Sequence, residues 1–132
     1  VTQAGRALEF VANDFKGDKE VVMAAISQDG LALEFVADAL RADKEVVMVA
    51  VSQHGLALEY AASCWKRDRE VILAAVRSKV YAIQFADPDL NDTAVGIEAV
   101  RRDGLVLQCC PPALRADRKV VMAAVTSKRN KE

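Results

Sequence analysis

Two short blocks recur about every 25 residues along this 132-residue chain. The block Gly-Leu-Ala-Leu-Glu-Phe-Val at residues 30–36 returns at 55–61 and 5–11, and more loosely at 80–86 and 104–110. Self-similarity at such a period is the signature of a repeat array. The predicted units are residues 5–29, 30–54, 55–79, 80–103 and 104–128. Residues 1–4 match the end of a unit, so we expect a segment of a longer array.

Each unit predicts two helices. The first begins at the glycine and runs about ten residues, with apolar residues on one stripe. The second begins at an aspartate that can accept backbone N–H groups as an N-cap, and its apolar residues have helical spacing. In the second unit the stripes are Ala32, Phe35, Val36, Ala39 and Leu40, then Val46, Val47, Ala50 and Val51; the capping residues are Asp18, Asp43, Asp68, Asp92 and Asp117.

The run Val-Val-Met-Ala-Ala-Val leaves a rival interpretation open, because β-branched residues also suit a buried strand. That would make a β/α solenoid. The aspartate directly before the run and the alanine pair within it favour a helix. We therefore predict an all-α fold, a right-handed α/α superhelical solenoid of about five helical hairpins of 25 residues each, stabilised by the stacking of neighbouring units.

The unit GLALEFA…DKEVVMAAV resembles a family of tandem helical repeats known only as a domain of unknown function, found in long arrays. The resemblance covers nearly the whole chain and is weakest at residues 80–103. It implies the helical-repeat fold. It implies no activity, cofactor or catalytic residue.

Charge and cysteine usage narrow the classes of function. The net charge is −1, but residues 1–66 hold six basic and ten acidic residues, giving −4, whereas residues 67–132 hold twelve and nine, giving +3. No apolar run is long enough to span a bilayer, so we expect no membrane insertion. Cys64, Cys109 and Cys110 lack metal-site spacing, which favours an intracellular, reducing compartment, by default the cytoplasm. We expect these thiols to be buried or half-buried, and the lone His54 to lie in an exposed turn.

One polar residue recurs in the middle of each first helix and forms the most regular candidate site. Either this column contacts a partner, or each member donates or accepts a hydrogen bond within the array, for example with Ser78. Equivalent carboxylates cannot supply the divergent acid and base of a catalytic pair. The column is Glu9, Glu34, Glu59, Gln84 and Gln108.

Further candidate contacts lie near the fourth unit, which departs most from the pattern. It has lost one loop residue and carries Gly96 inside its second helix, which indicates either relaxed constraint or a kink that shapes a surface. Trp65 is expected to be exposed beside it, and Arg101 with Arg102 forms a small basic cluster. Basic residues near the loops alternate with acids, which is typical of a solvated, ion-paired edge.

These features predict a non-catalytic scaffold that binds one or more protein partners. We expect no enzyme activity, no cofactor, no metal and no small-molecule ligand. Two alternatives remain, a structural linker subunit of a large complex and a helical-repeat protein that binds nucleic acid. The near-neutral charge argues against nucleic acid as the partner.

Overall fold

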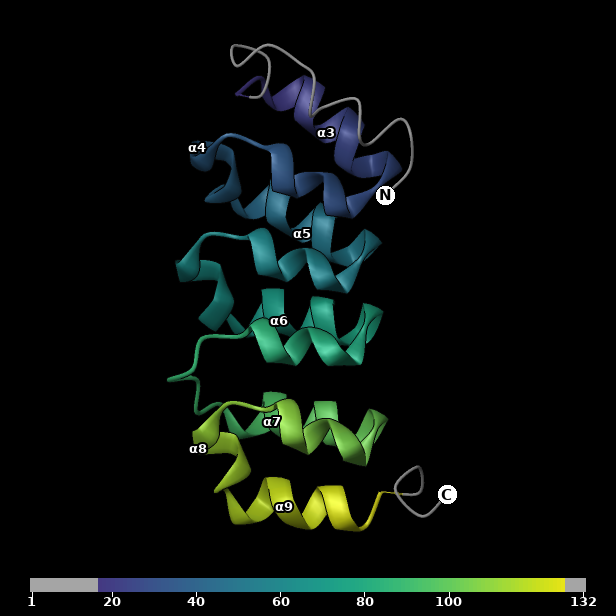
Figure 1. The fold of residues 1–132 in the computed structure, drawn as a ribbon, viewed down its shortest axis with the longest axis vertical. Coiled ribbons are helices and arrows are strands. Elements are labelled where there is room, and N and C mark those ends of the chain that lie inside the picture. Colours follow the sequence, from purple (N-terminus) through teal and green to yellow (C-terminus); the bar gives the residue numbers. More distant parts are fainter. Residues whose placement is uncertain (1–16, 128–132) are drawn as a thin grey trace.

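Within the described residues, the five longer α-helices cross the long axis of the molecule one after another. The computed structural model describes residues 17–127, and every regular element within them is helical. Elements that are close in sequence pack together along the stack, as Figure 1 shows. The helices are α3 (Lys19–Gln28), α5 (Lys44–Gln53), α6 (Arg69–Ser78), α7 (Thr93–Arg102) and α9 (Arg118–Val125).

The predicted second helix of each unit is confirmed. In α5, Asp43 accepts hydrogen bonds from the backbone N–H groups of Glu45 and Val46 at 2.9 and 3.4 Å. The four apolar positions expected to face the core, at residues 46, 47, 50 and 51, are all buried. The valine-rich runs are therefore helical, and the part of the chain that is described contains no strand.

In the four units whose first helix lies within residues 17–127, that helix is not the expected ten-residue α-helix, and in the first unit it lies outside the described residues. It is a six-residue 3-10 helix, η2 (Gly30–Phe35), and Val36 after it is extended, with ψ of 144°. A 3-10 helix places residues three apart on one line, so Gly30, Leu33 and Val36 are buried together. Ala39 of the predicted stripe is exposed instead. The other copies are η3 (Gly55–Tyr60), η5 (Val80–Phe85) and η6 (Gly104–Cys109).

A short helical turn then leads back to the next α-helix. The turns are α4 (Asp38–Arg41), η4 (Ser63–Arg67) and α8 (Pro112–Arg115). Neighbouring turns are joined by a backbone hydrogen bond from Ala62 N to Arg41 O at 3.1 Å. The fourth unit has no such helix, because its shortened loop makes only a turn in which Leu90 N donates to Asp87 O.

His54 lies at the junction between α5 and η3 and has a structural task. It is half-buried, and its Nδ1 accepts a hydrogen bond from Leu56 N at 3.3 Å. Asp29 and Asp103 cap their 3-10 helices in the same way. The expectation of an exposed turn residue was therefore wrong, because the turn position is also an N-cap.

The glycines that open η2 and η3 allow close packing. A left-handed glycine at this helix end is typical of many proteins, yet no described glycine has a positive φ. A β-carbon on Gly55 would instead lie 2.3 Å from the carbonyl oxygen of Ala75 and 2.9 Å from Lys79 N. At Gly30 the corresponding distance to Ala50 O is 2.2 Å. These glycines let a 3-10 helix lie directly on the last turn of the α-helix that follows it.

We expect Gly55→Ala to lower the free energy of unfolding by about 2 kcal/mol, because the added methyl group must displace backbone atoms. Gly17→Ala is the matched control, since its nearest described neighbour would be 4.0 Å away. Urea unfolding followed by circular dichroism measures both. Equal stability of the two variants would contradict this account of the close contact.

Candidate functional site: a cleft in the fourth unit

A ladder of ion pairs runs along the N-terminal ends of the stacked α-helices. The basic residue that opens one helix contacts the aspartate that caps the next, so each such carboxylate both caps its own helix and binds its neighbour. Lys19 Nζ lies 3.1 Å from Asp43 Oδ2, Lys44 Nζ lies 3.8 Å from Asp68 Oδ2, and Arg69 Nε lies 2.7 Å from Asp92 Oδ2. The expected ion-paired edge is therefore present.

The same contacts shift the titration of the capping carboxylates. The hydrogen bond from Lys19 lowers the pKa of Asp43, and that from Arg69 lowers the pKa of Asp92. Between α7 and α9, the hydroxyl of Thr93 donates to Asp117 and lowers the pKa of that carboxyl. In each case the hydrogen bond favours the charged form.

The regular spacing changes at the fourth unit, where Val80 replaces the glycine that opens the other units. At Gly30 and Gly55 a β-carbon would collide with the α-helix that follows. The β-carbon of Val80 would therefore collide with α7 if α7 lay as close to η5 as α5 lies to η2. Accordingly, η5 packs less extensively on α7 than η2 does on α5, and α7 packs less extensively on α6 than α6 does on α5. We attribute the looser contact between α6 and α7 to the side chain of Val80.

Gly96 explains the close packing on the opposite side of α7, against α9. It is buried, and a β-carbon there would lie 2.9 Å from Val120 Cγ2 and 3.2 Å from Leu114 Cδ2. The helix continues unbroken through this residue from Thr93 to Arg102, so Gly96 does not mark a kink. Nor is it a position of relaxed constraint, because a side chain there would collide with its neighbours. The glycine admits α9 at close range.

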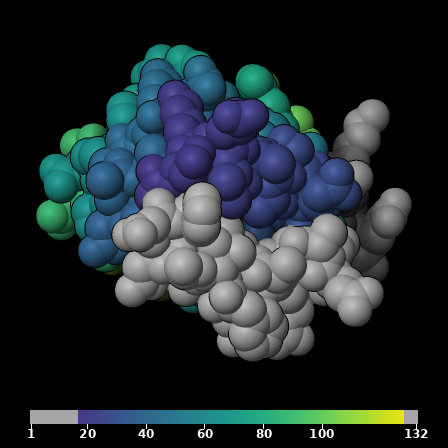
Figure 2. Space-filling view, turned by 90° about the horizontal axis from the view of Figure 1, so that it is seen from above, coloured from purple at the N-terminus to yellow at the C-terminus, as the bar shows by residue number. Residues whose placement is uncertain are grey.

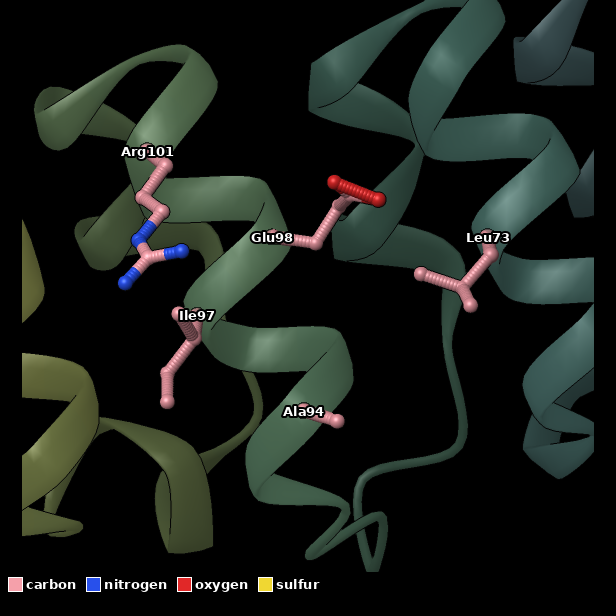
Figure 3. A pocket seen from close by; sticks show the side chains of 5 residues that line it. All are labelled: Leu73, Ala94, Ile97, Glu98 and Arg101. Carbon is pink, nitrogen blue, oxygen red and sulfur yellow. The ribbon is translucent and has the colours of Figure 1, made fainter.

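An open cleft of about 420 Å³ lies where α6 and α7 pack loosely. Figure 3 shows Leu73 on α6 pointing toward α7, while Ala94 and Glu98 on α7 point toward α6. Ile97 and Arg101 extend the lining over the adjacent face of α7. The cleft thus combines the half-buried Leu73 and Ile97 and the exposed Ala94 with one acidic and one basic group.

Each polar group of the cleft has a different environment. Glu98 accepts hydrogen bonds from Arg77 Nη2 and Nε at 3.0 and 3.2 Å. Arg101 is exposed and makes no ion pair within residues 17–127. Ala94 stands where the neighbouring helices have Glu45 and Glu70, which removes one carboxylate from the ladder at this step. Within residues 17–127, the positive charge of Arg101 is therefore not compensated by an ion pair.

Of the predicted site residues, Arg101 lines this cleft and Arg102 does not. Arg102 is half-buried at the end of α7, and its Nε is enclosed without a hydrogen-bond partner among the described residues. Trp65 is half-buried, not exposed. Its Nε1 donates to Ala42 O of the preceding unit at 2.7 Å, and Lys44 Nζ lies 5.7 Å from its ring. Trp65 therefore joins two units.

The predicted polar column faces solvent in residues 17–127, and Glu9 lies outside them. Glu34, Glu59, Gln84 and Gln108 are all exposed. Burial, followed by the nearby Glu34 and Glu59, raises the pKa of Tyr60 to about 12. The serine suggested as a partner, Ser78, accepts a hydrogen bond from Gly55 N instead.

Sequence reasoning did not identify Leu73, Ala94, Ile97 or Glu98 as site residues. A signal was available in the fourth unit, where valine replaces glycine at position 80 and alanine replaces glutamate at position 94. Each substitution is unremarkable alone. Their joint effect depends on which surfaces of α6 and α7 meet.

The three cysteines differ in environment. Cys110 is buried, and its Sγ lies 3.6 Å from Val106 O; burial raises the pKa of its thiol to about 11. Cys109 is half-buried. Cys64 is exposed, so the expectation of buried or half-buried thiols was wrong for this residue alone.

We expect one thiol to react much faster than the others in the folded protein. The thiolate is the reactive form, and Cys110 is both buried and protonated at neutral pH. Mass spectrometry after brief treatment with iodoacetamide should find label on Cys64 and not on Cys110. Denatured protein, in which all three should react, is the control. Early labelling of Cys110 in the folded chain would contradict its burial.

The ladder predicts a loss of stability in acid. A carboxylate with a lowered pKa contributes stability above its unfolded pKa of about 4, and this is lost as pH falls through the folded value. In Arg69→Met the Asp92 contact is absent. We therefore expect the stability difference between wild type and Arg69→Met to narrow as pH is lowered from neutral into the region below about 4.

Thermal unfolding of both proteins over that range measures this difference. Arg115→Met, which removes an exposed arginine outside the ladder, is the control and should show a smaller difference from wild type at neutral pH. A pH-independent difference for Arg69→Met would show that the ion pair does not stabilise the fold.

The stacked helical elements define an all-helical, repeat-like protein. A family model for a domain of unknown function (DUF4116) matches residues 1–41, 43–91 and 97–130. The chain belongs to this family. The comparisons found no matching curated protein and no matching solved structure. In residues 17–127, no helix has the length and apolar character needed to cross a membrane.

Proposed function

We propose that this chain is a superhelical solenoid of five repeats and acts as a non-catalytic scaffold for a protein partner. The partner binds with a peptide segment in the cleft between α6 and α7. That segment presents an apolar side chain to Leu73 and Ile97 and an acidic side chain to Arg101. The carrying observation is the cleft itself, which occurs where the repeat pattern departs from its regular packing.

Charge supports an acidic segment as the occupant. Lys19, Lys44 and Arg69 are engaged in the ladder, and Arg77 is held by Glu98. Arg101 has no such contact in the described part of the chain. A carboxylate brought to it by a partner would gain a charge-assisted hydrogen bond without breaking an existing ion pair.

The shape of the site and its charge favour a protein over the other partner classes. The cleft is open to solvent, whereas small-molecule sites enclose most of their ligand. The ladder cations are neutralised by adjacent carboxylates, so they do not form the uncompensated basic surface that attracts phosphates. An extended segment needs only a shallow groove with an apolar contact and a charged one.

Selection of short random peptides displayed on phage tests the proposal with defined ligands. We expect enriched peptides to pair an apolar residue with a nearby aspartate or glutamate. Arg101→Glu should weaken their binding about tenfold or more, because it places like charges together. Arg115→Glu is the matched control, since it reverses an exposed arginine that does not line the cleft and should leave affinity unchanged. Affinities are measured by isothermal titration calorimetry.

A second variant tests the cleft independently of charge. Val80→Gly restores the residue found at this position in the other units, so α7 should approach η5 and the cleft should narrow. Peptide affinity should then fall although no lining residue has changed. Failure to enrich any peptide, or peptides that bind Arg101→Glu and Val80→Gly as well as wild type, would overturn the proposal.

A further inference from the structure

Arg77 on α6 and Glu98 on α7 form a clamp between two neighbouring units. The Nε and Nη2 atoms of Arg77 both donate to one oxygen of Glu98, at 3.2 and 3.0 Å. Neither residue is a helix cap, so the clamp is separate from the ladder at the N-terminal ends of the helices. It requires an arginine near the end of one α-helix and a carboxylate in the middle of the next.

The next step of the stack has the arginine of this clamp but lacks the carboxylate. Arg101 is the ninth residue of α7, as Arg77 is of α6. Ala123 is the sixth residue of α9, where α7 has Glu98. The helix α9 packs on α7 more extensively than α7 packs on α6, so distance does not explain why Arg101 makes no ion pair within residues 17–127. The missing carboxylate at position 123 explains it.

The side chain of Arg101 lies on the side of α7 that faces away from α6. Figure 3 shows Glu98 directed toward α6, whereas Arg101 and Ile97 extend in the other direction. The α-helix that packs against α7 on that side is α9, which follows it in the stack of Figure 1. Arg101 is exposed and Ala123 is half-buried. The guanidinium is therefore accessible to a carboxylate that enters between α7 and α9.

We propose that the peptide segment crosses α7 and places its carboxylate between α7 and α9, over Ala123. The carboxylate then accepts hydrogen bonds from Arg101 as Glu98 accepts them from Arg77, so the partner completes a clamp that the chain leaves open. This inference rests on the proposed binding of an acidic segment in the cleft, and it specifies where the acidic residue of that segment lies. A carboxylate suits the adjacent donors of a single guanidinium.

This course takes the segment along the stack and not along the groove between two helices. Figure 2 looks along the stack from α3, with the later units behind the earlier ones. The segment passes from Leu73 on α6 across Ile97 on α7 to Arg101. Neighbouring helix axes are about 8–10 Å apart, and an extended chain advances about 3.3 Å per residue. The apolar residue and the acidic residue of the segment should therefore be about two to four residues apart.

Ala123→Glu supplies the missing carboxylate from within the chain and should close the clamp. The affinity of peptides selected on wild type should fall about tenfold or more, because the new side chain competes for Arg101 and repels the carboxylate of the peptide. Ala123→Gln is the matched control, since it adds a side chain of the same length without a charge and should keep most of the affinity. Isothermal titration calorimetry of the whole chain measures both variants.

The stability of the protein without peptide gives a second readout. If residue 123 faces Arg101, replacing glutamine by glutamate at this position should raise the urea midpoint relative to the same replacement in proteins that also carry Arg101→Met. The comparison cancels the effect of the charge on α9 itself, because that effect is present in both backgrounds. An equal change of the midpoint in the two backgrounds would show that the two positions do not meet and would overturn the inference.

The course of the segment is tested with peptides that differ in the spacing of the apolar and the acidic residue. Peptides with a spacing of about two to four residues should bind best, and equal affinity at every spacing would count against the course across α7. Peptides that bind Ala123→Glu as well as wild type would overturn this inference alone. Failure of every peptide to bind wild type would overturn the proposed function and this inference with it.

Discussion

The distance between a 3-10 helix and the following α-helix controls the spacing of the units. At Gly30 and Gly55 the backbone approaches the carbonyl oxygen of an alanine so closely that a single methyl group would collide with it. The contact involves few atoms and contributes little energy by itself. Its importance is geometric, because it determines where the next α-helix lies and hence which apolar residues that helix can bury. In the fourth unit Val80 stands in place of the glycine, and we attribute the cleft to the looser packing of α7 that results.

Sequence alone predicted the α-helices correctly, because their signals are local. An aspartate cap and apolar residues at helical spacing act within ten residues, and burial in α5 follows that pattern. In the four units where it is described, the first helix was predicted incorrectly for an equally physical reason. Gly-Leu-Ala-Leu-Glu-Phe is composed largely of good α-helix formers, and six residues are too few to separate a period of 3 from one of 3.6. In the second unit the break that ends η2 has no proline or glycine to mark it; Arg41 stabilises it by donating hydrogen bonds to the carbonyl oxygens of Val36 and Glu34.

The candidate site was only partly predictable, because its residues depend on contacts between units. Arg101 could be recognised as a basic residue in an irregular repeat. Leu73 could not be recognised, because other units have a similar apolar residue, methionine, at the same position. It borders a cleft because α7 packs less extensively on α6. Trp65 shows the opposite error. A tryptophan in a polar loop suggested exposure, but the carbonyl of Ala42 is left free at the end of α4 and accepts its indole N–H.

The distribution of paired charges separates two kinds of surface on this molecule. Along the stack, basic residues at the helix ends contact the next capping carboxylate, so they contribute to cohesion and are not available to a partner. Arg101 makes no ion pair in the described part of the chain and lies beside Ile97, an apolar residue that is only partly buried. A carboxylate of a partner could therefore reach Arg101 without displacing an ion pair that holds neighbouring units together.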